Sequence, residues 1–188
     1  IVESTFTHSG KKRNLVFDIQ KYKKFKDKIK YCVVEKKPDM VETINSYDTD
    51  HVKKNKTIMN AVWFENSQRN AINNLLGSAD VNDQIIISDV DEIPNLEKVN
   101  FKNIKTKLIL FKQKMFYYKF NLLLDKMVWC GSKSCKKIDL ISPQWLREVK
   151  DKKYPRWRLD TYFSKKKYNS IYFVDNGGWH FTNIKTPE

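Results

Sequence analysis

The chain has 188 residues, of which 40% are hydrophobic and 13% aromatic, and this composition is typical of one packed globular domain. It excludes an intrinsically disordered protein. No stretch approaches the ~18 apolar residues of a membrane span, and no charged and apolar leader is present, so we expect neither a membrane segment nor a signal peptide in this chain.

The formal charge of +14 comes mainly from lysine, since the chain has only five arginines. Nucleic-acid readout relies strongly on arginine forks, so we favour a solvated lysine-rich surface and expect no nucleic acid. A basic nucleic-acid-binding module stays open as an alternative. The three cysteines form no C-x-x-C pair, which predicts free thiols and favours a soluble, cytoplasmic protein. A Golgi-lumen anchor would require an upstream segment.

The first part of the chain predicts strands that alternate with helices. The opening "IVESTF" indicates the end of a strand, and the apolar spacing in 17–29 predicts an amphipathic helix. A second strand is expected over 30–35, and the polar run 36–55 is expected to be a long surface connection. A second helix is expected over 56–76, with Gly77 at its end.

The stretch "QIIISDVDEIPN" (84–95) joins the most apolar run of this part of the chain to three carboxylates, Asp89, Asp91 and Glu92. A continuous apolar run bounded by polar residues is typical of a strand buried on both faces of a parallel sheet. Ligands of such α/β sheets bind at the carboxyl ends of the strands. The acidic residues lie at such an end.

The second part of the chain predicts mainly strands, in a meander. Strand candidates lie within 107–112, 114–124 and 126–138, where aromatic residues are frequent. Ser142 and Pro143 supply the N-cap and first residue of a short helix. The segment 170–183 predicts a further strand, then a Gly-Gly turn, then Trp179 and His180.

Two carboxylates separated by one residue can reach a single Mg²⁺ or Mn²⁺ ion, whereas three unpaired acids without a cation repel one another. Phosphatases of the haloacid dehalogenase type use D-x-D with the first aspartate as nucleophile, usually followed by Gly-Thr. Nucleotide-sugar transferases use D-x-D to hold a metal at the diphosphate. In this chain Glu92-Ile93 replaces Gly-Thr, which favours the transferase over the phosphatase.

The ordered set of motifs resembles glycosyltransferase family 17, whose members include β-1,4-mannosyl-glycoprotein N-acetylglucosaminyltransferases. The resemblance rests on "SDVDEIP" (88–94), on the preceding E-x-x-Q-R-x-x-I pattern (65–72) and on "GGWHF" (177–181). "IVESTFTHSGKKRNL" and "ISPQWLR" add to it. It implies one α/β catalytic domain over 1–188 with the A-type nucleotide-sugar transferase fold, a Rossmann-like mixed sheet, lacking the family's first strand and last helix.

The resemblance also implies the roles of individual residues. Asp91 is expected to bind the metal directly, Asp89 to touch the metal or the ribose, and His180 to complete the metal or diphosphate site. Arg69 is expected either to contact the diphosphate or to support the aspartates, with Glu65 as its partner.

The remaining candidates are more peripheral. Glu3 is expected near the uracil or ribose, and Lys114 and Arg156 are candidate contacts to phosphate or acceptor. The family's linkage implies inversion at the anomeric carbon, which requires a general base, and the candidates are Asp175 and Asp160.

The expected cofactor is Mn²⁺ or Mg²⁺, together with a nucleotide-sugar donor. The implied donor is UDP-N-acetylglucosamine, and the implied partner is a glycan or glycoprotein acceptor. Trp129, Trp157 and Trp179 would either stack on sugar faces or pack in the core.

Overall fold

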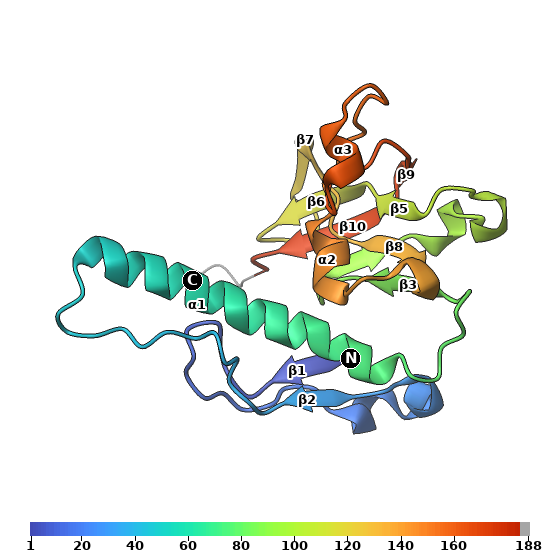
Figure 1. The fold of residues 1–188 in the computed structure, drawn as a ribbon. Coiled ribbons are helices and arrows are strands. Elements are labelled where there is room, and N and C mark those ends of the chain that lie inside the picture. Colours follow the sequence, from blue (N-terminus) through green and yellow to red (C-terminus); the bar gives the residue numbers. More distant parts are fainter. Residues whose placement is uncertain (185–188) are drawn as a thin grey trace. The chain divides into compact units, whose positions relative to one another are not determined.

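The computed structural model describes residues 1–184 and divides the chain into two compact units, Ile1–Ser78 and the part from Ala79 onward (Figure 1). Among the described residues, no helix combines the length and apolar character needed to cross a bilayer.

The first unit is a small parallel sheet with one long helix. Its elements in chain order are β1 (Val2–Ser4), the 3-10 helix η1 (Ile19–Lys28), β2 (Cys32–Val34), α1 (Asp50–Asn70) and the 3-10 helix η2 (Ala71–Leu75). The two strands pair in parallel. Helix α1 buries Phe64, whose ring lies 5.8 Å from that of Phe6 just beyond β1.

Both strands predicted for this unit are confirmed, but both helices differ from the prediction. The segment expected to be an amphipathic helix forms η1, which is kinked at Tyr22 and buries none of its residues. Helix α1 begins at Asp50 rather than at Lys56, because the side chain of Thr49 accepts a hydrogen bond from the Val52 amide and caps the helix. The polar connection is correspondingly shorter than predicted.

The second unit contains two four-stranded sheets. One sheet has the order β3-β8-β5-β9, with bounds Gln84–Ile87, Lys133–Lys136, Leu108–Phe111 and Ile171–Val174. The other has the order β4-β10-β6-β7, with bounds Glu92–Pro94, Gly178–Thr182, Gln113–Tyr117 and Leu123–Trp129. Each sheet contains parallel and antiparallel pairs. The α/β class with mixed sheets is therefore confirmed.

The prediction of a parallel, doubly buried environment for the isoleucine strand is wrong. In the described part of the chain β3 pairs only with β8, in antiparallel register, and lies at the edge of its sheet. Ile85 and Ile87 are buried whereas Ile86 is only partly so. A run of three isoleucines satisfies both environments equally well, and the partner strand lies far along the sequence.

The core of the second unit is centred on β5, all four residues of which are buried. Helix α2 (Pro143–Glu148) packs on β8 and β3, and Ser142 caps it by accepting a hydrogen bond from the Trp145 amide, as predicted. Further helical turns are α3 (Asp160–Phe163), η3 (Leu96–Lys98), η4 (Phe101–Asn103) and η5 (Lys137–Asp139).

The strands predicted in the second part of the chain are confirmed only in part. The candidate 114–124 contains parts of β6 and β7, and 126–138 contains the end of β7 and all of β8. The predicted meander is wrong, because β5 and β8 belong to one sheet whereas β6 and β7 belong to the other. All three cysteines have free thiols. The A-type transferase fold and the assignment of residues 1–188 to one catalytic domain stay predictions.

Candidate functional site

The acidic motif connects the two sheets of the second unit. Strand β3 ends at Ile87 and belongs to one sheet, whereas β4 begins at Glu92 and belongs to the other. A tight turn, in which the Glu92 amide donates to the Asp89 carbonyl at 3.1 Å, joins them. Asp89 and Asp91 therefore lie in a connection between sheets, where a side chain can stay partly exposed while the neighbouring strands are packed.

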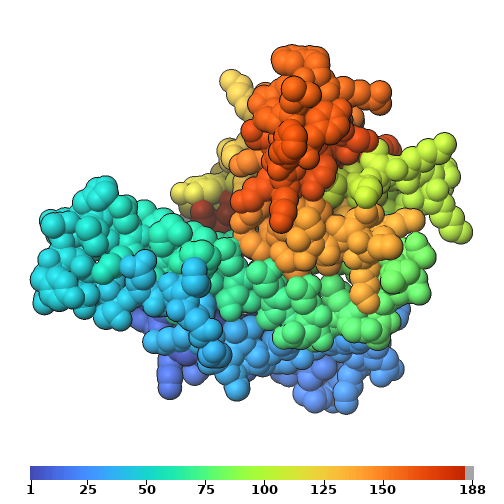
Figure 2. Space-filling model, in the orientation of Figure 1, coloured from blue at the N-terminus to red at the C-terminus, as the bar shows by residue number. Residues whose placement is uncertain are grey.

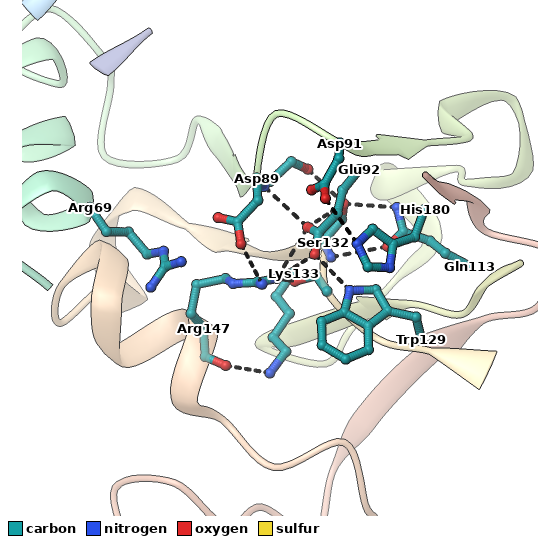
Figure 3. A network of polar contacts seen from close by, with 12 residues as sticks. Arg69, Asp89, Asp91, Glu92, Gln113, Trp129, Ser132, Lys133, Arg147 and His180 are labelled. Carbon is teal, nitrogen blue, oxygen red and sulfur yellow. Dashed lines mark hydrogen bonds and ion pairs between the residues drawn. The ribbon is translucent and has the colours of Figure 1, made fainter. Parts of the chain in front are cut away.

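Glu92 is the buried centre of a group of polar residues that we call the Glu92 cluster: Asp89, Glu92, Trp129, Ser132 and Arg147 (Figure 3). Its side chain is 1% exposed. It accepts hydrogen bonds from the Trp129 indole at 2.7 Å and from the Asp89 amide at 3.1 Å. A buried carboxylate is stable only when its oxygens are paired in this way.

Arg147 supplies the positive charge of the cluster. Its Nη2 lies 2.8 Å from Asp89 Oδ2 and its Nη1 lies 3.0 Å from Glu92 Oε1, and it also donates to the Gly131 carbonyl. The side chain is 12% exposed. The sequence predicts the helix that contains Arg147 but indicates no role for this residue, because nothing in the sequence relates the helix to the motif at 89–92.

Lys133, buried on β8, holds the end of α2. Its Nζ donates to the carbonyls of Arg147, at 2.6 Å, and of Val149, at 2.5 Å. These carbonyls lie in and just after the last turn of the helix, where backbone acceptors lack helical partners. Burial, assisted by the nearby charge of Arg147, lowers the pKa of Lys133 to about 8.

Asp91 and His180 form a second pair beside the cluster. His180 lies on β10 directly opposite Glu92 of β4, and its Nε2 is 3.2 Å from Asp91 Oδ2. The Trp129 ring stacks on the imidazole with a centroid distance of 4.9 Å and an interplanar angle of 20°. The other imidazole nitrogen, Nδ1, is buried without a hydrogen-bond partner among the described residues.

The Asp91–His180 pair fits a divalent cation. Two neighbouring ligands of an octahedral ion with bonds of about 2.1 Å lie about 3 Å apart, close to the separation of this oxygen and nitrogen. Residues 1–184 contain no group of three or more histidine, cysteine or acidic side chains arranged as a complete metal site. The pair supplies two protein ligands at most, and the metal at this position stays a prediction. Asp89, which Arg147 holds, stays only a predicted ligand.

Glu3, predicted near the nucleotide, is fully engaged within the first unit. Its carboxylate accepts from Arg13, from the Tyr31 hydroxyl and from the amides of Val16 and Phe17. Burial would raise the pKa of Glu3, but these four hydrogen bonds together lower it to about 2. Glu3 thus holds the loop that follows β1. Its contact to the uracil or ribose stays a prediction.

The two candidate bases both lie in exposed ion pairs of the second unit. Asp175 follows β9, is 77% exposed and pairs with Lys112 at 2.8 Å. Asp160, in the exposed part of the unit around α3 (orange in Figure 2), binds both Arg158 and Lys167. Hydrogen bonds from Arg158 and Lys167 lower the pKa of Asp160 to about 2. A carboxylate this acidic is a weak proton acceptor at neutral pH.

The remaining candidates lie in three separate elements. Lys114 is exposed on β6, opposite Trp179 of β10. Arg156 is exposed in the loop before α3. Arg69 lies in the last turn of α1 and pairs with Glu65 at 2.8 Å, as the spacing predicted. Their proposed contacts to phosphate or acceptor stay predictions.

In a comparison with known protein families, residues 1–139 of the chain fit the model of glycosyltransferase family 17. The matched range includes the acidic motif and Trp129, and it ends before Arg147 and His180. No curated protein and no solved structure matches the chain.

Proposed function

Because the chain belongs to glycosyltransferase family 17, we propose that it is a metal-dependent, inverting transferase that moves a sugar from a nucleotide donor onto a glycan hydroxyl. The proposed donor is UDP-N-acetylglucosamine. The family membership supports sugar transfer, and the geometry of the second unit supports the dependence on metal.

The Asp91–His180 pair is the observation that carries this proposal. Asp91 is 39% exposed, so one of its carboxylate oxygens can meet a ligand from solvent while the other contacts the imidazole. A divalent cation held there would neutralise charge on the diphosphate leaving group. Asp91 and His180 would hold this ion, and Asp89 would contact it or the ribose.

The neighbouring residues hold the pair in position. Trp129 stacks on the His180 ring and donates its indole N–H to Glu92, so the imidazole plane is fixed by a residue that is itself anchored. Backbone pairing adds to this, because the Phe181 amide donates to the Asp91 carbonyl at 2.9 Å. Such support keeps functional groups near their working geometry before the substrate arrives.

The general base would remove the proton from the acceptor hydroxyl. Of the two candidates we propose Asp175. Asp160 forms ion pairs with two cationic side chains, Arg158 and Lys167, and its pKa of about 2 is far below neutral pH. Lys112, the partner of Asp175, is itself partly exposed, and an acceptor can therefore displace it at modest cost.

The first test is calorimetric titration of the protein with a panel of UDP- and GDP-sugars, each with and without Mn²⁺. We expect one UDP-sugar to bind only with Mn²⁺, and Asp91→Asn to lower its affinity at least 10-fold, because a neutral amide is a poor ligand for a hard cation. The matched control is Asp125→Asn, an equivalent change at an exposed position of β7.

Equal donor binding with and without metal, or an unaffected Asp91→Asn variant, would contradict the proposal. Release of phosphate from simple phosphomonoesters would instead indicate the D-x-D phosphatase. That chemistry needs Asp89 as the nucleophile, whereas Arg147 pairs with its carboxylate.

A further inference from the structure

We propose that Arg147 is the positioning residue of the acidic motif: it neutralises Asp89 and Glu92 and thereby leaves Asp91 as the carboxylate that receives the cation. This inference rests on the proposed function. It gives the three neighbouring acids three different tasks, which their sequence does not distinguish.

The contacts of Arg147 support this division. Its two terminal nitrogens bind different carboxylates, Asp89 at 2.8 Å and Glu92 at 3.0 Å. A planar guanidinium bridges two carboxylates in this manner because its donors form a rigid fork. Asp91 is turned toward His180 instead (Figure 3).

The charges of the motif lead to the same conclusion. With all three acids ionised, the motif carries three negative charges within four residues, and Arg147 compensates one of them. Without Arg147, one negative charge of the motif that the guanidinium now compensates would act on the cation.

Arg147 acts inside the protein and not on the substrate. Both of its terminal nitrogens are already engaged with carboxylates, one of them also binds the Gly131 carbonyl, and its side chain is 12% exposed. An arginine that grips a diphosphate needs its fork directed toward the ligand. The fork of Arg147 is occupied by the motif itself.

The backbone of Arg147 is also fixed. Lys133 donates to the carbonyl of Arg147 itself and to that of Val149, so the end of α2 is attached to β8. Strand β8 in turn pairs with β3, the strand that leads into the acidic motif. The guanidinium is therefore held from the helix side and from the motif side.

The test measures Mn²⁺ affinity of the protein without donor, by electron paramagnetic resonance of free Mn²⁺, and the kcat and KM for the donor. We expect Arg147→Gln to bind Mn²⁺ about 10-fold more tightly, or to bind a second ion, because Asp89, released from its contact with Arg147, becomes a further ligand. The kcat is expected to fall at least 10-fold, with a smaller change in KM, because the motif loses its geometry.

Two more variants separate charge from folding. Arg147→Lys keeps the positive charge but loses the forked donors of the guanidinium, so we expect a smaller gain in Mn²⁺ affinity. This variant replaces Arg147→Gln in the test if the glutamine variant does not fold. The double variant Asp89→Asn/Arg147→Gln removes one charge of each sign and is expected to return Mn²⁺ affinity to the wild-type value. Lys107→Gln, at the exposed pair with Asp139, is the control for loss of a cation.

The outcomes distinguish the two proposals. A wild-type protein that binds no Mn²⁺, either alone or together with the UDP-sugar donor, would overturn the metal dependence and this inference together. If the wild type binds Mn²⁺ and the Arg147 variants bind it equally or less tightly, the inference alone is overturned. A variant with unchanged Mn²⁺ affinity but strongly raised donor KM would show instead that Arg147 binds the diphosphate.

Discussion

Among residues 1–184, each unit of the molecule contains one buried glutamate, and the two are held by similar groups for different purposes. Glu3 and Glu92 each accept hydrogen bonds from an arginine, from an aromatic side chain and from backbone amide groups. The partners of Glu3 all lie within the first 31 residues of the chain. Those of Glu92 are distributed over 89–147.

The difference lies in whether the arginine is shared. Arg13 forms its ion pair with Glu3, so that cluster closes on itself and stabilises a loop. Arg147 also binds Asp89, whose side chain is 38% exposed, and next to it Asp91 reaches solvent. The buried carboxylate of Glu3 thus stabilises a loop. The buried carboxylate of Glu92 helps to hold an arginine that also pairs with a partly exposed carboxylate of the acidic motif. The variants below test this distinction.

The largest effect is expected from Gly131→Ala, which would break the Glu92 cluster. A Cβ at Gly131 would overlap the Glu92 carboxylate and the Trp129 indole nitrogen, and both must then move. We expect a loss of about 3 kcal/mol in the free energy of unfolding, together with most of the activity. Urea denaturation followed by tryptophan fluorescence measures it. Gly77→Ala is the matched control, because a Cβ there meets no atom within 4 Å.

A smaller effect is expected from Glu3→Gln, which would weaken the closed cluster of the first unit. We expect a loss of roughly 2 kcal/mol in stability at pH 7, because charge-assisted hydrogen bonds are replaced by neutral ones. The pKa of Glu3 is lowered in the fold from 4.5 to about 2. Its stabilisation is therefore complete above the unfolded pKa and is lost as the pH falls from about 4.5 toward 2.

The stability of wild type and Glu3→Gln, measured by denaturation between pH 7 and pH 2, is thus expected to converge in acid. A difference that stayed constant over this range would show that Glu3 does not act through its charge. Unchanged Mn²⁺ binding by the Glu3→Gln variant is expected as well, since this glutamate has no part in the acidic motif.

The smallest effect is expected from Trp129→Phe, which separates the two contacts of this residue. Phenylalanine keeps a ring against His180 but cannot donate to Glu92, so we expect a loss of about 1 kcal/mol in stability with most metal binding retained. Trp129→Leu removes both contacts and should weaken Mn²⁺ binding further. The control is Trp157→Phe at a position that is 78% exposed.

Local sequence patterns predicted many of the local structures in this protein, because such structures depend on residues that are close together in the sequence. The cap at Ser142, the strands on either side of the Gly-Gly turn and the ion pair between Glu65 and Arg69 were all readable. Asp91 and His180 were paired only through the family resemblance. Their contact at 3.2 Å gives that pairing a geometric basis.

The sequence by itself therefore determined most of the strands, the family and the acidic motif with its candidate histidine. Tertiary structure alone decided that β3 lies antiparallel at a sheet edge, that Glu92 is buried, and that Arg147 bridges two acids. The physical reason is distance along the chain. Helix caps and turns are set by contacts between residues a few positions apart, whereas Arg147 reaches Asp89 across 58 residues, through the packing of a helix on a sheet.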